Sequence, residues 1–252
     1  MGNATTATRP RTRSRTPVPT RTAEWRPFEG EIEEYSRTVI GRTLRDYQLE
    51  AAQTIVHHAR ERTGETLVVM FARQMGKNEL SAQVEGYLLD TYGVEGATMV
   101  KAAPTFRPQL HVSLARLRSS LHAARYQGAL RGAHGYRLGL GRAEIAFLSA
   151  APHAHVAGAT ASLLLEVDEA QDVDADKYQR DLRPMVSSTS APTVLYGTAW
   201  APDSLLEVQR AANEALTAKD GIRRNFICDW TVGAERNPAY RRFVEAEIAR
   251  LG

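Results

Sequence analysis

Short apolar runs alternate along this chain with segments whose apolar residues recur at helical spacing. Runs with the length and composition of buried strands lie at 66–71, 97–102, 144–148, 162–167, 192–199 and 223–229. Helical spacing is found over 44–56, 77–91, 108–125, 203–218 and 238–251. The stretch 127–142 is rich in glycine and indicates a loop with a short hairpin. This alternation predicts an α/β fold with a mostly parallel sheet covered by helices on both faces.

The first strand-like run leads into Ala72-Arg73-Gln74-Met75-Gly76-Lys77-Asn78, and a helix follows. Phosphate-binding loops occupy this position because backbone N–H groups at a helix N-terminus attract phosphate oxygens and a lysine adds a full charge. Compared with the pattern G-x-x-x-x-G-K-S/T, Phe71 replaces the first glycine and Asn78 replaces the hydroxyl residue. The stretch therefore predicts a nucleoside triphosphate site, and the alternative is a turn that caps a helix.

A second stretch, Ser162 to Asp172, is an apolar run that ends in the adjacent carboxylates Asp168 and Glu169. Ligands of open α/β sheets bind at the carboxyl ends of the strands. Alternation along a strand points the two side chains differently, so Asp168 is expected to hold Mg²⁺ and Glu169 to polarise an attacking water. The alternative is a strand that ends in an acidic turn.

Three further residues are candidates for nucleotide contacts. Thr198 follows Gly197 at the end of an apolar strand, where a hydroxyl can sense a γ-phosphate; an ordinary turn is the alternative. Tyr47 and Gln48 lie on a helix just before the first strand, where an aromatic ring and an amide can contact an adenine. An ordinary amphipathic helix is the alternative for that pair.

The formal charge of +3 is unevenly distributed. Residues 1–23 contain five arginines and no acid, which leaves a net charge of −2 for the rest of the chain. The tail is almost devoid of apolar residues, so we expect it to be disordered. Its arginines favour nucleic acid or another acidic surface, with a solvated leader as the alternative. Arg107, Arg116, Arg118 and Arg125, on the predicted helix 108–125, are compatible with a DNA-facing surface or a solvated face.

Other residue classes exclude several functions. The single cysteine, Cys228, excludes an intrachain disulfide and is expected to be a small core residue. His153 and His155 have no third ligand at suitable spacing, and the acids from Asp172 onward lack the glycine and glutamate of a calcium loop. No apolar run reaches transmembrane length, so we expect a soluble intracellular protein.

Taken together, these stretches resemble the ATPase domain of the large terminase subunit, the motor that packages double-stranded DNA into tailed-phage heads. The resemblance covers roughly residues 40–250 and rests on Arg73 to Lys77 as a variant Walker A motif, Leu163 to Glu169 as Walker B, and Tyr196-Gly197-Thr198 as the coupling motif. Tyr47-Gln48 is similar to the family's adenine-reading motif, and Ala103-Pro104-Thr105 to the segment after the second strand. The resemblance implies a P-loop NTPase fold of the ASCE, RecA-like class.

The resemblance also assigns roles by position. It implies that Lys77 contacts the β- and γ-phosphates, that Arg73 senses the γ-phosphate, and that Thr198 couples hydrolysis to movement. ATP and Mg²⁺ are the implied cofactors. The nucleotide-binding residues are then Tyr47, Gln48, Arg73, Gln74, Met75, Gly76, Lys77, Asn78 and Thr198; the metal residues are Asn78 and Asp168; and the catalytic residues are Glu169, Lys77 and Arg73.

Two departures from the family pattern matter. Asn78 replaces the Ser/Thr that ligates Mg²⁺, and an amide oxygen is still a suitable ligand, so weakened or water-mediated coordination is expected. Where many relatives have an arginine finger, this chain has Val156-Ala157-Gly158. A finger from a neighbouring subunit is then expected at Arg131, Arg137 or Arg142.

The resemblance further implies a domain plan and partners. We expect a P-loop ATPase domain over 24–235 and a C-terminal helix over 236–252 that leads toward a nuclease domain absent from this chain, so no DNA cleavage is expected of it. The implied partners are double-stranded DNA, the portal protein, the small terminase subunit and further copies in a ring, usually of five. The implied location is the host cell cytoplasm, transiently at the procapsid portal. A helicase-like DNA-dependent ATPase and a nucleotide-gated DNA-binding or assembly module without hydrolysis are the alternatives.

Overall fold

The computed structural model describes residues 25–122, 124–126, 128–133, 136–154, 156 and 158–251. The arginine-rich tail over 1–23 and His155 lie outside the described residues, so their predictions are not tested. Within the described ranges, no helix has both the length and the apolar character needed to cross a membrane.

One eight-stranded sheet runs through the described chain in the order β3-β4-β5-β2-β6-β7-β1-β8. Its pairs are parallel except β3–β4 and β4–β5, so the mostly parallel sheet and the hairpin within 127–142 are confirmed. The strands are β1 Thr66–Phe71, β2 Thr98–Ala103, β3 Leu130–Ala133, β4 Arg137–Leu140, β5 Ala143–Ser149, β6 Leu164–Val167, β7 Thr193–Gly197 and β8 Asn225–Cys228.

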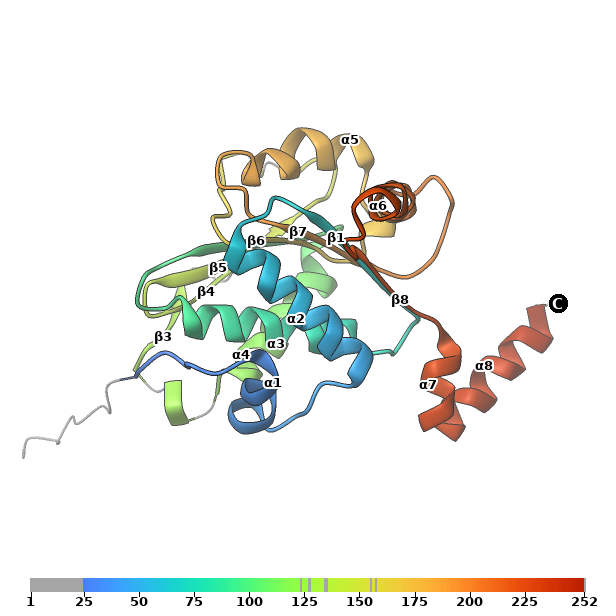
Figure 1. The fold of residues 1–252 in the computed structure, drawn as a ribbon, viewed down its shortest axis with the longest axis horizontal. Coiled ribbons are helices and arrows are strands. Elements are labelled where there is room, and N and C mark those ends of the chain that lie inside the picture. Colours follow the sequence, from blue (N-terminus) through green and yellow to red (C-terminus); the bar gives the residue numbers. More distant parts are fainter. Residues whose placement is uncertain are drawn as a thin grey trace, which may run out of the picture.

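Helices cover both faces of this sheet (Figure 1). They are α1 Ile32–Tyr35, α2 Asp46–Glu61, α3 Lys77–Thr91, α4 His111–Ser120, α5 Ala175–Lys177, α6 Leu205–Asp220, α7 Trp230–Arg236 and α8 Pro238–Leu251. Wider or tighter helical turns lie at Ser36–Ile40, Phe106–Leu110, Ala124–Tyr126, Ala170–Asp172, Tyr178–Leu182 and Arg183–Val186.

The side chains of β1 point alternately to the two faces of the sheet, and each face has its own hydrophobic core. Leu67, Val69 and Phe71 join the core under α2, α3 and α4, whereas Val68 and Met70 join the core under α6 and the 170–186 segment. Because successive side chains of a strand point to opposite faces, an all-apolar strand must be covered on both sides. Cys228 lies buried at the end of β8, as predicted.

The prediction of one helix over 108–125 was wrong at its C-terminal end. Helix α4 ends at Ser120, and a separate turn brings Arg125 and Tyr126 to the buried carboxylate of Asp90. Arg125 Nε lies 3.1 Å and Tyr126 Oη 2.7 Å from Asp90 Oδ2. The buried Asp90 carboxylate needs donors, and Arg125 supplies one from an exposed position, so its role on the surface stays a prediction.

Helix α7 was not predicted, and with α8 it forms a C-terminal arm. We use that name for residues 230–251. The arm extends away from the sheet and its covering helices (Figure 1). Its second helix matches the predicted bounds 238–251.

A cluster of ionisable side chains is buried between α3 and the sheet. Lys101 of β2 pairs with Glu85 of α3 at 2.8 Å and also contacts Ser81. Neither carboxyl oxygen of Glu166, on β6, has a hydrogen-bond partner in the described part. Burial first, and then Glu85, raise the pKa of Glu166 well above its ordinary value. Burial by itself would lower the pKa of Lys101, but the surrounding carboxylates raise it. The raised pKa of Glu166 favours its protonated form, which leaves Lys101 paired with Glu85 alone.

This charge assignment predicts different costs for two substitutions. Lys101→Met leaves Glu85 buried and unpaired, so we expect a loss of about 3–5 kcal/mol in the free energy of unfolding. Glu166→Gln replaces a neutral group by one of similar shape and is expected to change stability much less. Denaturant unfolding of both variants measures the difference, and equal losses would contradict a protonated Glu166.

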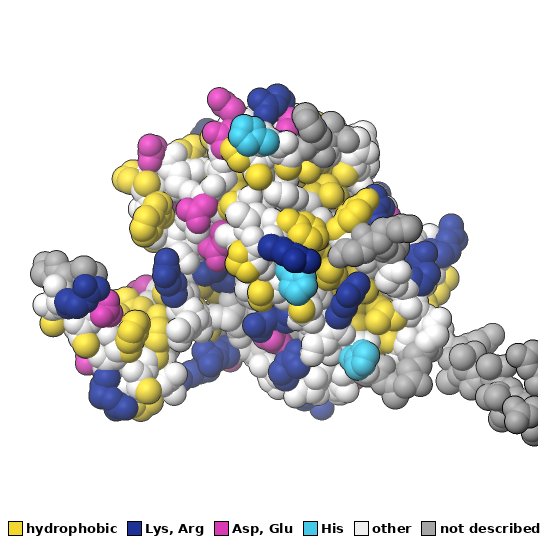
Figure 2. All heavy atoms as spheres, turned by 180° about the vertical axis from the view of Figure 1, so that it is seen from behind, with side chains coloured by type: hydrophobic (Ala, Val, Ile, Leu, Met, Phe, Trp, Pro, Cys, Tyr) yellow, Lys and Arg dark blue, Asp and Glu magenta, His cyan; other side chains and the backbone are white. Residues whose placement is uncertain are grey.

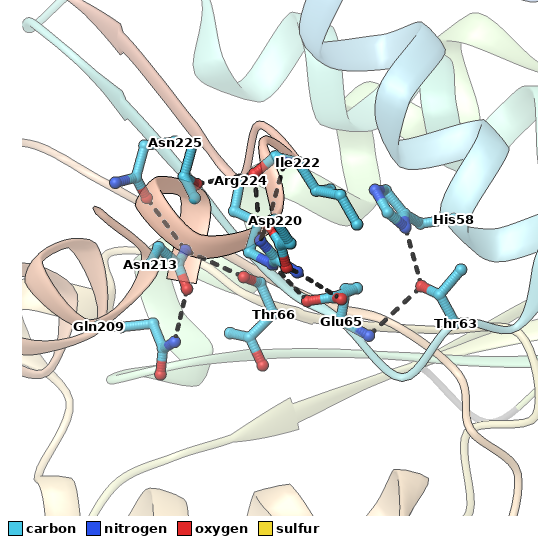
Figure 3. A network of polar contacts seen from close by, with 11 residues as sticks. His58, Thr63, Glu65, Thr66, Gln209, Asn213, Asp220, Ile222, Arg224 and Asn225 are labelled. Atoms are coloured by element: carbon cyan, nitrogen blue, oxygen red, sulfur yellow. Dashed lines mark hydrogen bonds and ion pairs between the residues drawn. The ribbon is translucent and has the colours of Figure 1, made fainter. Parts of the chain in front are cut away.

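A second network holds β1 to β8 and α6 at the end of the sheet opposite the Gly-Lys loop (Figure 3). The buried Arg224 guanidinium donates to both oxygens of Glu65, at 2.6 and 2.8 Å, and to both oxygens of Asp220, at 2.9 and 2.8 Å. Asn213 adds a bond to the Thr66 carbonyl at 3.0 Å. Hydrogen bonds from Arg224 lower the pKa of Glu65, and they lower that of Asp220 to about 2.

The depressed pKa values predict an acid-sensitive contribution to stability. A carboxylate whose pKa is lower in the folded state stabilises the fold above its unfolded pKa, near 4, and loses that contribution as the pH falls through the folded value. Arg224→Met should therefore lower the melting temperature at pH 7, and its deficit relative to wild type should shrink between about pH 4 and pH 2. A deficit that is constant over this range would indicate lost packing alone.

Candidate active site

The loop between β1 and α3 has the backbone of an anion site. Gln74 and Gly76 have positive φ values of 62° and 82°. Among the described residues, the backbone N–H groups of Gly76, Lys77 and Asn78 donate to no protein oxygen. A Cβ on Gly76 would lie 2.4 Å from Gln48 Nε2, so glycine suits both the conformation and the space. Free N–H groups at a helix N-terminus attract anions.

The ammonium group of Lys77 lies where β1 and β7 end side by side. Its Nζ donates to the Phe71 carbonyl at 3.1 Å and to Thr198 Oγ1 at 2.9 Å. The residue is only 9% exposed. Burial lowers the pKa of Lys77, while Glu169 and Asp168 act in the opposite direction. The parallel pairing of β1 with β7 thus joins the predicted Lys77 and Thr198 across 121 residues.

The two predicted carboxylates lie at the end of β6, next to β7. Asp168 is buried, and its Oδ1 accepts the Glu169 N–H at 3.0 Å while its Oδ2 accepts from Ser113 Oγ at 3.4 Å. Glu169 has a positive φ of 48° and is half-buried. Both acids lie just beyond β6, which ends at Val167, and the division of roles between them stays a prediction.

Gln171 is a site residue that sequence analysis missed. Its Nε2 donates to Glu169 Oε2 at 2.7 Å, and its Oε1 accepts the Thr198 N–H at 3.2 Å. A Cβ on Gly197 would lie 2.3 Å from this oxygen, so the glycine before Thr198 makes room for the bridge. The position of Gln171 two residues after Glu169 was the available signal.

Residues of the loop and residues that follow β6 and β7 border one cavity of about 950 Å³. Predicted site residues in its lining are Arg73, Gln74, Gly76, Lys77, Asn78, Glu169 and Thr198. Lining residues that were not predicted are Glu79, Gln109, Arg116, Gln171, Asp172, Ala199 and Trp200. Trp200 is 73% exposed at this position. Met75 and Asp168 are buried beside the cavity and do not border it.

Tyr47 and Gln48 contact the loop itself. Tyr47 Oη donates to the Met75 carbonyl at 3.0 Å, and Gln48 Nε2 donates to the Gly76 carbonyl at 3.1 Å. Gln48 Oε1 accepts the N–H of Arg45 at 2.9 Å. Neither side chain borders the cavity, so in this structure they support the loop, and an adenine contact stays a prediction.

The three candidate finger arginines lie away from the cavity. Arg131 is on β3, Arg137 on β4, and Arg142 in the turn before β5, at the far edge of the sheet. None of them borders the cavity. A role across a subunit boundary stays a prediction for each of them.

The C-terminal arm contacts the loop from outside. Tyr240 Oη donates to the Arg73 carbonyl at 2.9 Å, and Gly233 lies against the thioether of Met75. Arg236 of the arm also pairs with Asp46 of α2 at 3.3 Å, and Val232 packs against the core, while α8 extends away from the rest of the molecule (Figure 2). The conformation of Arg73 is therefore linked to the position of the arm.

The oxygen donors at the site fit Mg²⁺ better than a softer metal. Asp168 supplies a carboxylate and Asn78 an amide oxygen, and Mg²⁺ is commonly held by one or two such groups together with phosphate oxygens and water. The described residues contain no group of three or more His, Cys, Asp or Glu side chains that could hold a metal unaided. A phosphate-bearing ligand would have to complete the coordination.

Comparison with known proteins gave no match for this sequence among protein-family models or curated proteins. Solved structures do match. The large terminase of bacteriophage HK97 aligns with a TM-score of 0.61 at 16% identity, covering 79% of this chain and 43% of that one. The large terminase ATPase domain of Thermus phage P74-26 aligns with a TM-score of 0.61 at 17% identity, covering 82% and 89%.

The chain has the fold of a large-terminase ATPase domain. The large terminase from a thermophilic bacteriophage, in complex with ADP, has a TM-score of 0.56 at 12% identity, covering 74% of this chain and 45% of that one. This chain therefore spans less than half of the HK97 terminase and of the ADP-bound terminase. The predicted P-loop α/β fold is confirmed by this terminase fold.

The Lys77–Thr198 contact predicts an effect on stability. Thr198→Val keeps the shape of the side chain but removes one acceptor from the buried ammonium group. We expect a loss of about 1–3 kcal/mol in the free energy of unfolding. Thr198→Ser keeps the hydroxyl and serves as the control, and a Ser variant as unstable as the Val variant would show that the methyl group matters instead.

Proposed function

We propose that this chain is the ATP-hydrolysing domain of a motor that packages double-stranded viral DNA. The observation that carries the proposal is the meeting of three strand ends at one cavity. β1 leads to the loop and Lys77, β7 to Thr198, and β6 to Asp168 and Glu169. The terminase fold supports the assignment, and one of its solved examples holds ADP.

The chemistry is attack of water on the γ-phosphate, aided by positioning and charge neutralisation. The N–H groups of Gly76, Lys77 and Asn78 and the Lys77 ammonium hold phosphate oxygens. Glu169 orients and polarises the water, and Gln171 fixes its carboxylate while contacting Thr198. A movement of Thr198 is thereby transmitted through Gln171 to Glu169. Arg73 contributes a positive charge from the cavity wall.

Mg²⁺ supplies further neutralisation of phosphate charge when it is bound, and Asp168 and Asn78 are the residues proposed to hold it. Asp168 is kept in place by Ser113 and by the N–H of Glu169. Asn78 offers a neutral oxygen where a hydroxyl is usual.

The motor assignment extends to domains and partners. We propose an ATPase domain over 24–235 and a following helical segment over 236–252. Double-stranded DNA is the proposed substrate for translocation, with portal protein, small terminase subunit and a ring of identical subunits as proposed partners. The proposed location is the host cell cytoplasm and, transiently, the procapsid portal.

Glu169→Ala tests the hydrolytic step. The variant is expected to bind ATP with Mg²⁺ like the wild type and to release phosphate about 100-fold more slowly or worse, because the polarising carboxylate is gone. Nucleotide binding and phosphate release are measured over a wide range of protein concentration. Release that rises more than linearly with concentration supports a residue supplied by a neighbouring subunit.

Asp172→Ala is the matched control, since Asp172 is an acid in the same cavity. Its phosphate release is expected to stay within a few-fold of wild type. Lys77→Ala should lose nucleotide binding. Tight binding by wild type without phosphate release at any concentration would favour the nucleotide-gated module, and absence of binding would refute the nucleotide site.

A further inference from the structure

One face of the helical segment 106–120 borders the phosphate site. Gln109 and Arg116 line the cavity, and Ser113 between them donates to Asp168. The spacing of four and three residues places these side chains on one side of a helix. Arg118, two positions further on, is exposed and does not border this cavity.

Within the cavity, Arg116 is held by an acid that lies beside the phosphate loop. Its Nη1 is 3.1 Å from Glu79 Oε2. Glu79 is the third residue of α3, whose first residue is Lys77. The guanidinium therefore rests next to the helix N-terminus at which phosphates are proposed to bind, and it is 41% exposed.

Glu79 has a second arginine partner. Arg42 Nε lies 2.9 Å from Glu79 Oε1, and Gln83 also donates to that oxygen at 2.9 Å. Burial by itself would raise the pKa of Glu79, but the bonds from Gln83, Arg42 and Arg116 lower it. If Arg116 moves away from Glu79, Arg42 remains as a charged partner. The movement of Arg116 therefore does not leave the Glu79 carboxylate unpaired.

A triphosphate that enters the cavity offers Arg116 a second anionic partner that competes with Glu79. Phosphate oxygens carry more charge than one carboxylate, and the planar guanidinium donates to either in the same geometry. If Arg116 stayed beside Glu79, it would not bind the phosphates and would only neutralise the carboxylate that repels them. The long side chain allows transfer without movement of α4.

We propose that Arg116 is a phosphate-contacting residue of this site, held on Glu79 in the free protein and transferred to the terminal phosphate of a bound nucleoside triphosphate. The assignment rests on the proposed function. It places a γ-phosphate contact within the same subunit, on a helix distinct from the loop and from the three strand ends.

Arg116→Gln and the matched variant Arg42→Gln test the assignment. Both remove one arginine from Glu79, but only Arg116 borders the nucleotide cavity. With Mg²⁺ present, calorimetry gives the dissociation constants of ATPγS and ADP for each protein. We expect Arg116→Gln to bind ATPγS about 10-fold more weakly or worse, with ADP binding unchanged, and Arg42→Gln to keep both affinities within about two-fold.

The assignment would be overturned if the two variants had equal ATPγS affinities, or if Arg116→Gln lost affinity for ATPγS and ADP alike. Arg116 would then be only a structural partner of Glu79. Arg116→Lys should recover part of the ATPγS preference, because it restores a charge. Thermal unfolding of all variants verifies that they fold. Failure of this proposal is distinct from failure of the proposed function: in the first case wild type still binds nucleotide and Lys77→Ala does not, and in the second wild type binds none.

Discussion

Parallel pairing of β1, β7 and β6 is the constraint on which the rest of this structure depends. Parallel strands end at the same edge of a sheet, so residues that are more than a hundred positions apart meet without any long-range signal of their own. The contact of Lys77 with Thr198 is the direct result. Asp168 and Glu169 follow from the next strand over.

Behind this edge, polar groups inside the protein hold the strands to the helix that carries the loop. Lys101 joins β2 to α3 through Glu85, and Glu166 contributes from β6 two residues before Asp168. Such a buried pair adds little net stability but is costly to break, so it restricts the position of α3 relative to β2, the strand that pairs with β6. The geometry between Lys77 and the acids depends on that restriction.

Around the same edge, elements that carry no motif complete the site. Gln171 links Glu169 to Thr198, the 106–120 segment contributes Gln109, Ser113 and Arg116, and the C-terminal arm contacts the loop at Arg73. Each of these connects the cavity to a different part of the molecule, which is the arrangement that the motor function proposed above would need.

The sequence by itself determined the strands, the loop with Lys77, the acidic pair and Thr198, because each depends on neighbours within a few positions: an apolar run, a glycine, a following helix. Only the tertiary structure decided the rest. Arg116 and Arg125 belong to the same apparent stripe of arginines, yet one pairs with Glu79 at the cavity and the other with the buried Asp90. The tertiary structure also shows that the Gln48 amide supports the loop, a contact that the sequence pattern does not indicate. A charged or amide side chain is placed by its partner, and these partners lie far away in the sequence.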